Sequence, residues 1–471
     1  MSACYEDLGN YDYSPINEIA IEGISEEYNV FFSDSFQLSP NLTFTLDPGG
    51  EDQNYDYEWF VINKAGVLPA EKKKDLSTEK DLNILVSLTP GKYTLYYRVL
   101  DKQSGIQWQQ TCDFNVKSNI FEGWLVLNDV AGEARLDMIS LINDKDSLIK
   151  DVLGFTHSSL ELTGKPKGVY TYHYDPNQYG IYVSTTGNGT TKIDPETFGW
   201  STTQHLSYEF ISKPSPTILA EYMQNNSSFS CFVYSEGNMY FYLRVMQVFY
   251  GVPINIVQGE EEPFEVAPFV GEGGYGNSIL YDNTNKRFVQ FNFNATNCTL
   301  MPEGEKFDFN TGKDLVYMIR SDFNSGEVFA ILKDTDSGKH YLGRVTEGTA
   351  KQTYYNEMPA TDIDQAENFA IDPVFGYIFY NVGSKVYEYD FSLKQSKLML
   401  DYGSSEITCL KFNGSKTDNT KLIVCSYDPA GETGKSGKME LFSVMPVNGP
   451  LELYESHEGL AKVVDVAYRE R

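Results

Sequence analysis

Residues 371–378, IDPVFGYI, contain the pattern that decides the fold of most of this chain: an apolar residue, an aspartate, a turn former and a new apolar run. The aspartate side chain can accept hydrogen bonds from the following turn, and proline fixes the local backbone. The pattern therefore predicts a strand that turns back into a second strand. It recurs at residues 174–183 (YDPNQYGIYV), 193–196 (IDPE), 281–289 (YDNTNKRFV), 389–392 (YDFS) and 427–430 (YDPA).

Repeated hairpins without a long segment of helical periodicity predict an all-β architecture for residues 118–471. This segment of roughly 350 residues matches a β-propeller of seven or eight blades, at about 40–50 residues per blade. Residues 463–468, VVDVAY, are expected to complete the first blade and close the ring. A β-helix or a second pair of sandwich sheets is the alternative. Strand clusters favour seven blades, and they begin near Gly123, Val169, Phe229, Ser278, Leu315, Asn368 and Ile407.

Residues 24–117 predict a separate β-domain ahead of the propeller. Residues 55–61, YDYEWFV, alternate in polarity, and residues 88–99, LTPGKYTLYYRV, place a Pro-Gly turn before a strongly alternating strand. A domain of this size with a central tryptophan strand and a late tyrosine-rich strand is typical of an Ig-like β-sandwich. We therefore expect Trp59 to lie in its core.

The stretch 4–13, CYEDLGNYDY, followed by residues 16–19, INEI, resembles the start of PKD-like family surface lipoproteins of Bacteroidetes. The resemblance continues more loosely to about Lys117. It implies an Ig/PKD-like N-terminal sandwich, in which the strands at 55–61 and 88–99 pack face to face, followed by a β-propeller-like domain. It also implies a role in nutrient acquisition at the outer membrane.

The residues around Cys4 predict a lipid anchor. Ser2 and Ala3 are the small residues that precede the lipidated cysteine of a bacterial lipobox, and Met1 then stands where a signal peptide has been cut away. Glu6 and Asp7 resemble the acidic signal that sends such lipoproteins to the cell surface. Residues 1–23 are accordingly expected to be a tether, with acyl chains holding an extracytoplasmic protein to the outer membrane. The alternative is an ordinary cysteine near the terminus.

The net charge of −29, from 66 acidic and 37 basic residues, argues against a nucleic-acid partner, since phosphate binding needs clustered Lys and Arg. No apolar run approaches the ~18–20 residues of a spanning helix, so we expect membrane contact only through the anchor. We also expect the protein to be a monomer. Five cysteines follow Cys4. This odd number without a CxxC pair excludes a disulfide scaffold and a cysteine-based zinc site. Cys409 and Cys425 lie on two apolar strands that could be neighbours, as a bridge or as buried free thiols.

The sequence contains no motif of an established enzyme class. It has no GxSxG elbow, and its five histidines show no HxH or HExxH spacing. Acids two residues apart occur at 144–147 (DKDS), 334–338 (DTDSG) and 362–364 (DID), but none continues into a twelve-residue calcium loop. We therefore expect no catalytic residue, no metal site and no cofactor, with Ca²⁺ binding left open by the acidity.

Two connectors combine flexibility with an aromatic side chain that could stack on a ligand. The loop 271–277, GEGGYGN, presents Tyr275, and Trp200 follows the turn that begins at Ile193. Both rings are predicted to be at least partly exposed and to contribute to a ligand site, the alternatives being a plain connector and packing between blades. The leading hypothesis is a non-catalytic binding or scaffold lipoprotein that takes a glycan or peptide, or docks onto an outer-membrane uptake complex. The alternatives are a glycan-active enzyme using channel carboxylates and a structural partner of a transporter.

Overall fold

The computed structural model describes residues 15–64, 72–118, 120–142, 145–175, 178–226, 230–271, 277–412 and 419–469. The chain divides into two compact units, Met1–Asn119 and Ile120–Arg471. The all-β prediction is confirmed. The described residues of the second unit contain one turn of α-helix, α2 (Val152–Phe155), beside several short 3-10 turns.

The first unit is a β-sandwich. Its larger sheet has five strands in the order β2 (Glu27–Phe31), β9 (Gln107–Lys117), β8 (Gly91–Asp101), β5 (Tyr55–Asn63) and β6 (Lys73–Ser77). Two strand pairs complete it: β1 (Ile19–Glu22) with β4 (Asn41–Phe44), and β3 (Ser35–Leu38) with β7 (Leu82–Leu85). The tether predicted for residues 1–23 is thus too long, because Ile19–Glu22 hydrogen-bond to β4 as part of the sandwich.

Trp59 lies in the core of this unit, as predicted, with a fully buried side chain. Its ring stacks on Tyr97 with 4.1 Å between centroids, and its Nε1 donates to the carbonyl oxygen of Glu79 at 3.1 Å. The expectation that the two strands pack face to face is wrong. β5 and β8 are hydrogen-bonded neighbours in one sheet with Trp59 opposite Tyr97, so their alternating side chains share one face.

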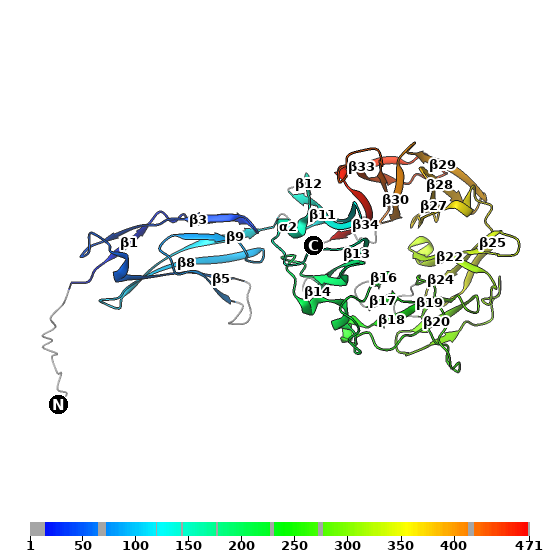
Figure 1. Ribbon diagram of the computed structural model, residues 1–471, viewed down its shortest axis with the longest axis horizontal. Helices are drawn as coiled ribbons and strands as arrows, with labels where there is room; N and C mark the ends of the chain where they lie inside the picture. Colours follow the sequence, from blue (N-terminus) through cyan, green and yellow to red (C-terminus); the bar gives the residue numbers. More distant parts are fainter. Residues whose placement is uncertain are drawn as a thin grey trace, which may run out of the picture. The chain divides into compact units, whose positions relative to one another are not determined.

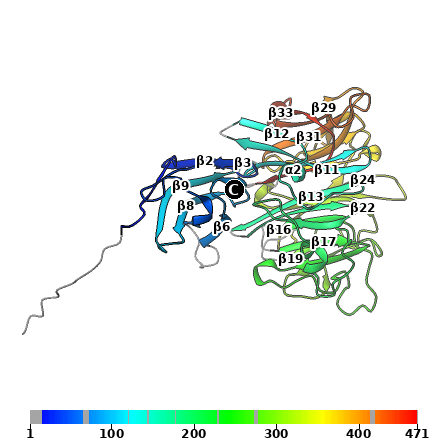
Figure 2. The same ribbon diagram turned by 60° about the vertical axis from the view of Figure 1, so that its left-hand side comes forward.

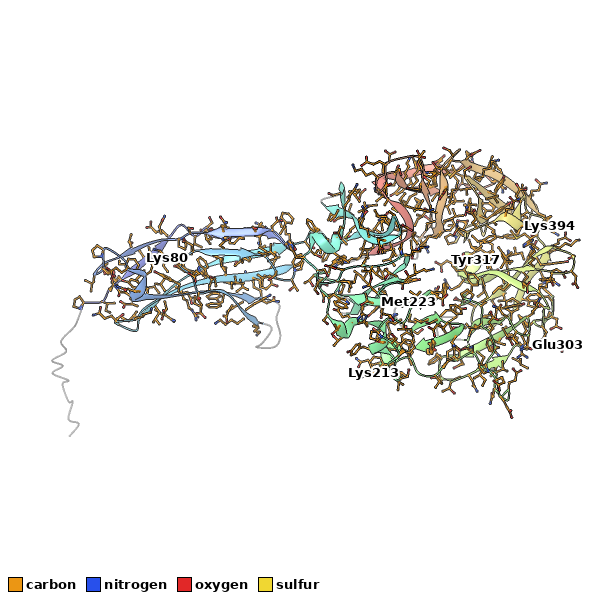
Figure 3. All side chains as sticks on the ribbon, in the orientation of Figure 1. Lys80, Lys213, Met223, Glu303, Tyr317 and Lys394 are labelled. Atoms are coloured by element: carbon orange, nitrogen blue, oxygen red, sulfur yellow. The ribbon has the colours of Figure 1, made fainter. Side chains whose placement is uncertain are left out.

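The second unit is a β-propeller, whose sheets follow one another around a ring (Figure 1). Tyr317 and Met223, labelled in Figure 3, lie on inner strands, while Glu303 and Lys394 lie at the rim. The described residues form seven sheets, which is compatible with the predicted blade number. Each blade is given from its inner strand outward: the first has β34 (Lys462–Arg469), β10 (Gly123–Val130), β11 (Glu133–Ile142) and β12 (Lys145–Ile149), and the second has β13 (Pro166–Asp175), β14 (Gln178–Thr185) and β15 (Gly189–Ile193). The third has β16 (Tyr222–Asn226), β17 (Ser230–Ser235) and β18 (Asn238–Tyr242), and the fourth has β19 (Asn277–Asp282), β20 (Arg287–Asn292) and β21 (Cys298–Leu300). The fifth has β22 (Asp314–Ser321), β23 (Glu327–Lys333), β24 (His340–Thr346) and β25 (Gln352–Glu357), the sixth has β26 (Phe369–Ile371), β27 (Ile378–Val382), β28 (Lys385–Asp390) and β29 (Gln395–Asp401), and the last has β30 (Glu406–Phe412), β31 (Lys421–Tyr427), β32 (Gly437–Ser443) and β33 (Glu452–Leu460).

Two devices predicted from the sequence build this ring. The last strand, β34, pairs with β10 and completes the first blade, which confirms the predicted closure. The aspartates of the repeated pattern cap their turns: Asp194 accepts from the backbone of Glu196 and Thr197, Asp390 from Ser392 and Leu393. Each hairpin is therefore fixed locally, and the blades pack through buried apolar clusters between neighbouring sheets.

The five described cysteines, from Cys112 to Cys425, are all buried and free. Cys409 and Cys425 face each other across β30 and β31, so the two strands are neighbours, as the sequence allowed. Burial raises the pKa of Cys298 to about 12 and that of Cys112 to about 11. These thiols are inert core groups rather than nucleophiles.

Candidate functional site

A polar cavity of about 620 Å³ opens where the inner strands β26, β30 and β34 begin. In a propeller, the loops between blades converge at an end of the ring, where inner strands begin. The volume of this cavity is typical of a small-molecule site. We refer to it as the polar basin. Its lining residues are Glu367, Asn368, Gly383, Ser384, Gly403, Ser404, Ser405, Glu406, Ile407, Thr408, Lys462, Val463 and Val464.

Short turns with small residues shape the polar basin. Gly403 has a φ of +65° and opens the loop between β29 and β30, with no atom near the position that a Cβ would take. Asp401 holds this loop to the β27–β28 turn, because its Oδ1 accepts from the Gly403 amide at 2.9 Å and from the Ser384 hydroxyl at 3.3 Å. The hydrogen bonds of Asp401 therefore fix the backbone of the loop between β29 and β30, and the space beside Gly403 stays open.

Two acidic residues of the polar basin have defined partners. Lys462 Nζ lies 2.6 Å from Oε2 of Glu406, and both side chains stay about half exposed. Such an exposed ion pair contributes only about 0–1 kcal/mol, so either partner can turn to a ligand at little cost. Glu367 accepts from Asn381 Nδ2 at 2.9 Å, and the Oδ1 of Asn381 accepts from Asn368 at 2.9 Å, which orients the amide of Asn368.

The polar basin can form hydrogen bonds through most of its lining residues. It offers serine and threonine hydroxyls, one amide, two carboxylates and one ammonium, and Ile407, Val463 and Val464 are its apolar lining residues. Histidine, cysteine and aromatic side chains do not occur among the lining residues. One of its two carboxylates is already paired with Lys462. This arrangement suits recognition of a polar molecule.

Trp200, one of the two residues predicted to bind a ligand, does not line the polar basin. Trp200 is half-buried beside the second blade, where its Nε1 donates to Thr191 Oγ1 at 2.7 Å and its ring meets His205 edge-on at 5.3 Å. Tyr275 and the predicted lipidation residue Cys4 lie outside the described residues. The polar basin was not predicted from the sequence; the run Gly403, Ser404, Ser405 directly before an apolar strand is its one local signal, and a weak one.

A second acidic group lies inside the sixth blade, with no solvent access. Asp372, in the turn after β26, and Glu388, on β28, are both fully buried. Burial raises the pKa of Asp372 to about 6 and that of Glu388 to about 7. Glu388 Oε1 accepts from Asn448 Nδ2 at 2.9 Å, but in the described part of the chain Oε2 of Glu388 and Oδ1 of Asp372 have no partner. These acids affect stability rather than a ligand.

Residues 4–166 match the model of the PKD-like family. No curated protein matches the chain. Among solved structures, it is similar to a quinonprotein alcohol dehydrogenase-like protein from Bacteroides thetaiotaomicron, with 11% identity, a TM-score of 0.47, and coverage of 94% of this chain and 97% of the other. It is also similar to the extracellular domain of a one component system from B. thetaiotaomicron (9%, 0.41, 98% and 68%) and to a Synechocystis apocarotenoid oxygenase mutant (8%, 0.39, 97% and 97%).

None of the helices in the described ranges has the length and apolar character of a membrane span. The family match covers the whole β-sandwich and continues into the first propeller blade, as far as Pro166 at the start of β13. The chain is therefore similar to the PKD-like family over residues 4–166, and the sandwich within this stretch is followed by a β-propeller.

Proposed function

We propose that this protein is a lipid-anchored, non-catalytic binding protein of the outer-membrane surface, which takes a glycan into the polar basin as part of nutrient acquisition. The observation that carries the proposal is the lining of the polar basin with hydroxyl, amide and carboxylate groups. Sugar hydroxyls both donate and accept hydrogen bonds, so they match this mixture. A peptide is the second ligand class, because its backbone offers the same two functions.

Filling the polar basin should abolish binding. Ser405→Trp places a large ring in the cavity, and Glu367→Gln removes a charged acceptor. We expect Ser405→Trp to weaken binding at least tenfold, and Glu367→Gln to weaken it less, because the amide keeps one acceptor. A glycan array with the soluble chain identifies the ligand, and calorimetry then measures its affinity.

The matched control is Thr335→Trp, which adds the same ring to an exposed hairpin turn between β23 and β24. It should bind like the unsubstituted chain. If Ser405→Trp binds the array ligand with unchanged affinity, the polar basin is not the binding site. Turnover of a bound glycan would instead favour the glycan-active enzyme.

Lipidation accounts for the membrane location in this proposal, and it rests on Cys4. The protein expressed with a lipoprotein signal peptide should partition into the detergent phase, and Cys4→Ala should move it to the aqueous phase. Cys112→Ala, which removes a buried thiol of the sandwich, is the control and should leave partitioning unchanged. Detergent partitioning of the Cys4→Ala variant would contradict the anchor.

A second function, docking onto an outer-membrane partner such as an uptake complex, is favoured by an exposed apolar patch beside the third blade. Two segments form it, joined where Phe210 bridges to Tyr250. The two segments carry six exposed apolar side chains, which we call the patch: Tyr208, Ile211, Met246, Val248, Phe249 and Val252. Ile211 and Met246 are about 70% exposed. Exposed apolar side chains gathered in this way often mark an interface.

A photo-crosslinking residue at Met246 tests this docking function in cells that make the protein from its own locus. We expect one defined membrane-protein adduct at Met246, and none from the same crosslinker at Thr335. Ile211→Asp should reduce the Met246 adduct severalfold, because a charge in the patch resists burial. An adduct pattern equal at the two positions would contradict docking, and a self-adduct would identify a second copy of this chain as the partner.

A further inference from the structure

Three potential metal ligands meet where the first and last blades adjoin. Asp146 comes from β12, the outermost strand of the first blade, whereas Glu455 and His457 come from β33, the outermost strand of the last. Figures 1 and 2 both draw β12 and β33 side by side. The ligand atoms of the three residues all lie within 4.8 Å of one another, and no other group of three in the described ranges is as close.

The strand periodicity explains this convergence. Glu455 and His457 are two residues apart on β33 and so project from one face, on which both are less exposed than their neighbours. Asp146 shares a face of β12 with Leu148, which packs against the buried cluster that contains Leu460. The apolar contact of Leu148 thus holds Asp146 against the last blade.

The imidazole of His457 is aimed at the carboxylates. Its side chain is nine-tenths buried, and Nε2 lies 2.6 Å from Oε1 of Glu455. In the described part of the chain Nε2 has no hydrogen-bond partner of good geometry, and the carboxylate of Glu455 is its close contact. Nε2 can therefore supply a third ligand atom beside the two carboxylates once its contact with Glu455 opens to make room for a cation.

The two carboxylates reinforce this arrangement. The carboxylate oxygens of Asp146 and Glu455 lie within 4.8 Å of each other and of the His457 ring nitrogen. Adjacent carboxylates repel each other unless a proton or a cation lies between them. Two carboxylate oxygens and one imidazole nitrogen form a ligand set that divalent transition metals accept.

We propose that Asp146, Glu455 and His457 bind one divalent cation of the Zn²⁺ or Mn²⁺ class, which fastens the outer strands of the first and last blades to each other. Ca²⁺ fits less well, because it takes six to eight oxygen ligands. The segment 144–147, whose acids stand two residues apart, thus contributes through Asp146, and its partners come from the other end of the propeller. The site is independent of the polar basin.

The test uses the full chain without an affinity tag, stripped of metal with a chelator. Co²⁺ titration, followed by visible absorption, should show one equivalent bound, and Zn²⁺ should displace it. Zn²⁺ should also raise the Tm of the propeller by a few degrees, because a ligand that binds only the folded state stabilises it. Asp146→Asn and His457→Asn should each weaken Co²⁺ binding at least tenfold and remove the Tm shift.

His157→Asn is the matched control, since His157 is an exposed histidine with a φ of +55°, which asparagine also tolerates. This variant should bind Co²⁺ like the unsubstituted chain. Asp146 is exposed, so Asp146→Asn keeps the test decisive if His457→Asn fails to fold. Absence of stoichiometric binding, or equal affinity in Asp146→Asn and the unsubstituted chain, would overturn the site and leave a proton shared by the two carboxylates.

Discussion

A chain that ends at Ala461, and therefore lacks β34, should not form a folded propeller. β34 is the inner strand of the first blade and pairs with β10 from Gly123 to Asp129. Its Val463 and Val466 are fully buried, and each such valine contributes about 1.5–3 kcal/mol. A domain has only about 5–15 kcal/mol of net stability, so the deletion removes a large share of it.

Polar contacts of β34 add to this loss. Oδ2 of Asp465 accepts from the Val169 amide at 3.0 Å, and its Oδ1 lies 2.7 Å from Lys411 Nζ. One side chain thus links the inner strands of the second and last blades. Without it, Lys411 loses its ion-pair partner, and β10 becomes an unpaired edge that favours aggregation.

Calorimetry of the truncated chain should show the transition of the sandwich but not that of the propeller. A chain ending at Arg469 retains all of β34 and is the length control; it should unfold like the full chain. Val466→Asp should reproduce much of the defect without any deletion, because it buries an unpaired charge. A cooperative propeller transition at the original temperature in the truncated chain would contradict the role of β34 in closure.

The elements that could be predicted from the sequence are those set by neighbouring residues. The Asp-Pro and Asp-Asn turns are local, since each aspartate caps the next few amides, and so the hairpins were predictable. The closing strand was predictable because VVDVAY is an apolar run left over after the other blades. Trp59 was placed correctly in the core, but its partner strand was not, because alternation alone does not distinguish strands of one sheet from strands of two facing sheets.

The candidate sites could not be predicted because they combine residues from distant segments. The polar basin draws on the starts of three inner strands, and none of its segments carries a motif. Asp146 lies near the start of the propeller sequence, whereas Glu455 and His457 lie near its end. The spacing of these three ligands along the chain therefore matches no local pattern. Trp200 stood out as an aromatic residue in a turn, whereas the polar basin was built from small polar residues, which also occur in ordinary loops.

The propeller should become less stable as the pH rises from about 5 to 8, and Glu388 should cause much of this loss. Burial raises its pKa from 4.5 to about 7, so between these values the folded state binds more protons than the unfolded state. The free energy of unfolding then falls with rising pH. Below pH 4.5 the carboxyl is protonated in both states and costs nothing, whereas above pH 7 the folded state holds a buried carboxylate.

Glu388→Gln should remove this pH dependence, since an amide of the same shape carries no proton that titrates. The oxygen of the new amide can still accept the hydrogen bond of Asn448, so the variant should match the unsubstituted chain near pH 4 and exceed it by about 3 kcal/mol at pH 8. Asp372→Asn should also reduce the fall of the free energy of unfolding with pH, but over a lower pH range, since burial raises the pKa of Asp372 from 3.8 to about 6.

Denaturant unfolding of the propeller at pH 4, 6 and 8 measures the difference. Glu452→Gln, at an exposed acid of β33, is the control and should leave the free energy of unfolding unchanged at both pH 4 and pH 8. An equal slope with pH in Glu388→Gln and the unsubstituted chain would show that Glu388 is not the group that titrates. The unpaired second oxygen of Glu388 is the physical reason to expect the effect, because a buried carboxylate with a single hydrogen bond is stabilised far less than it is in water.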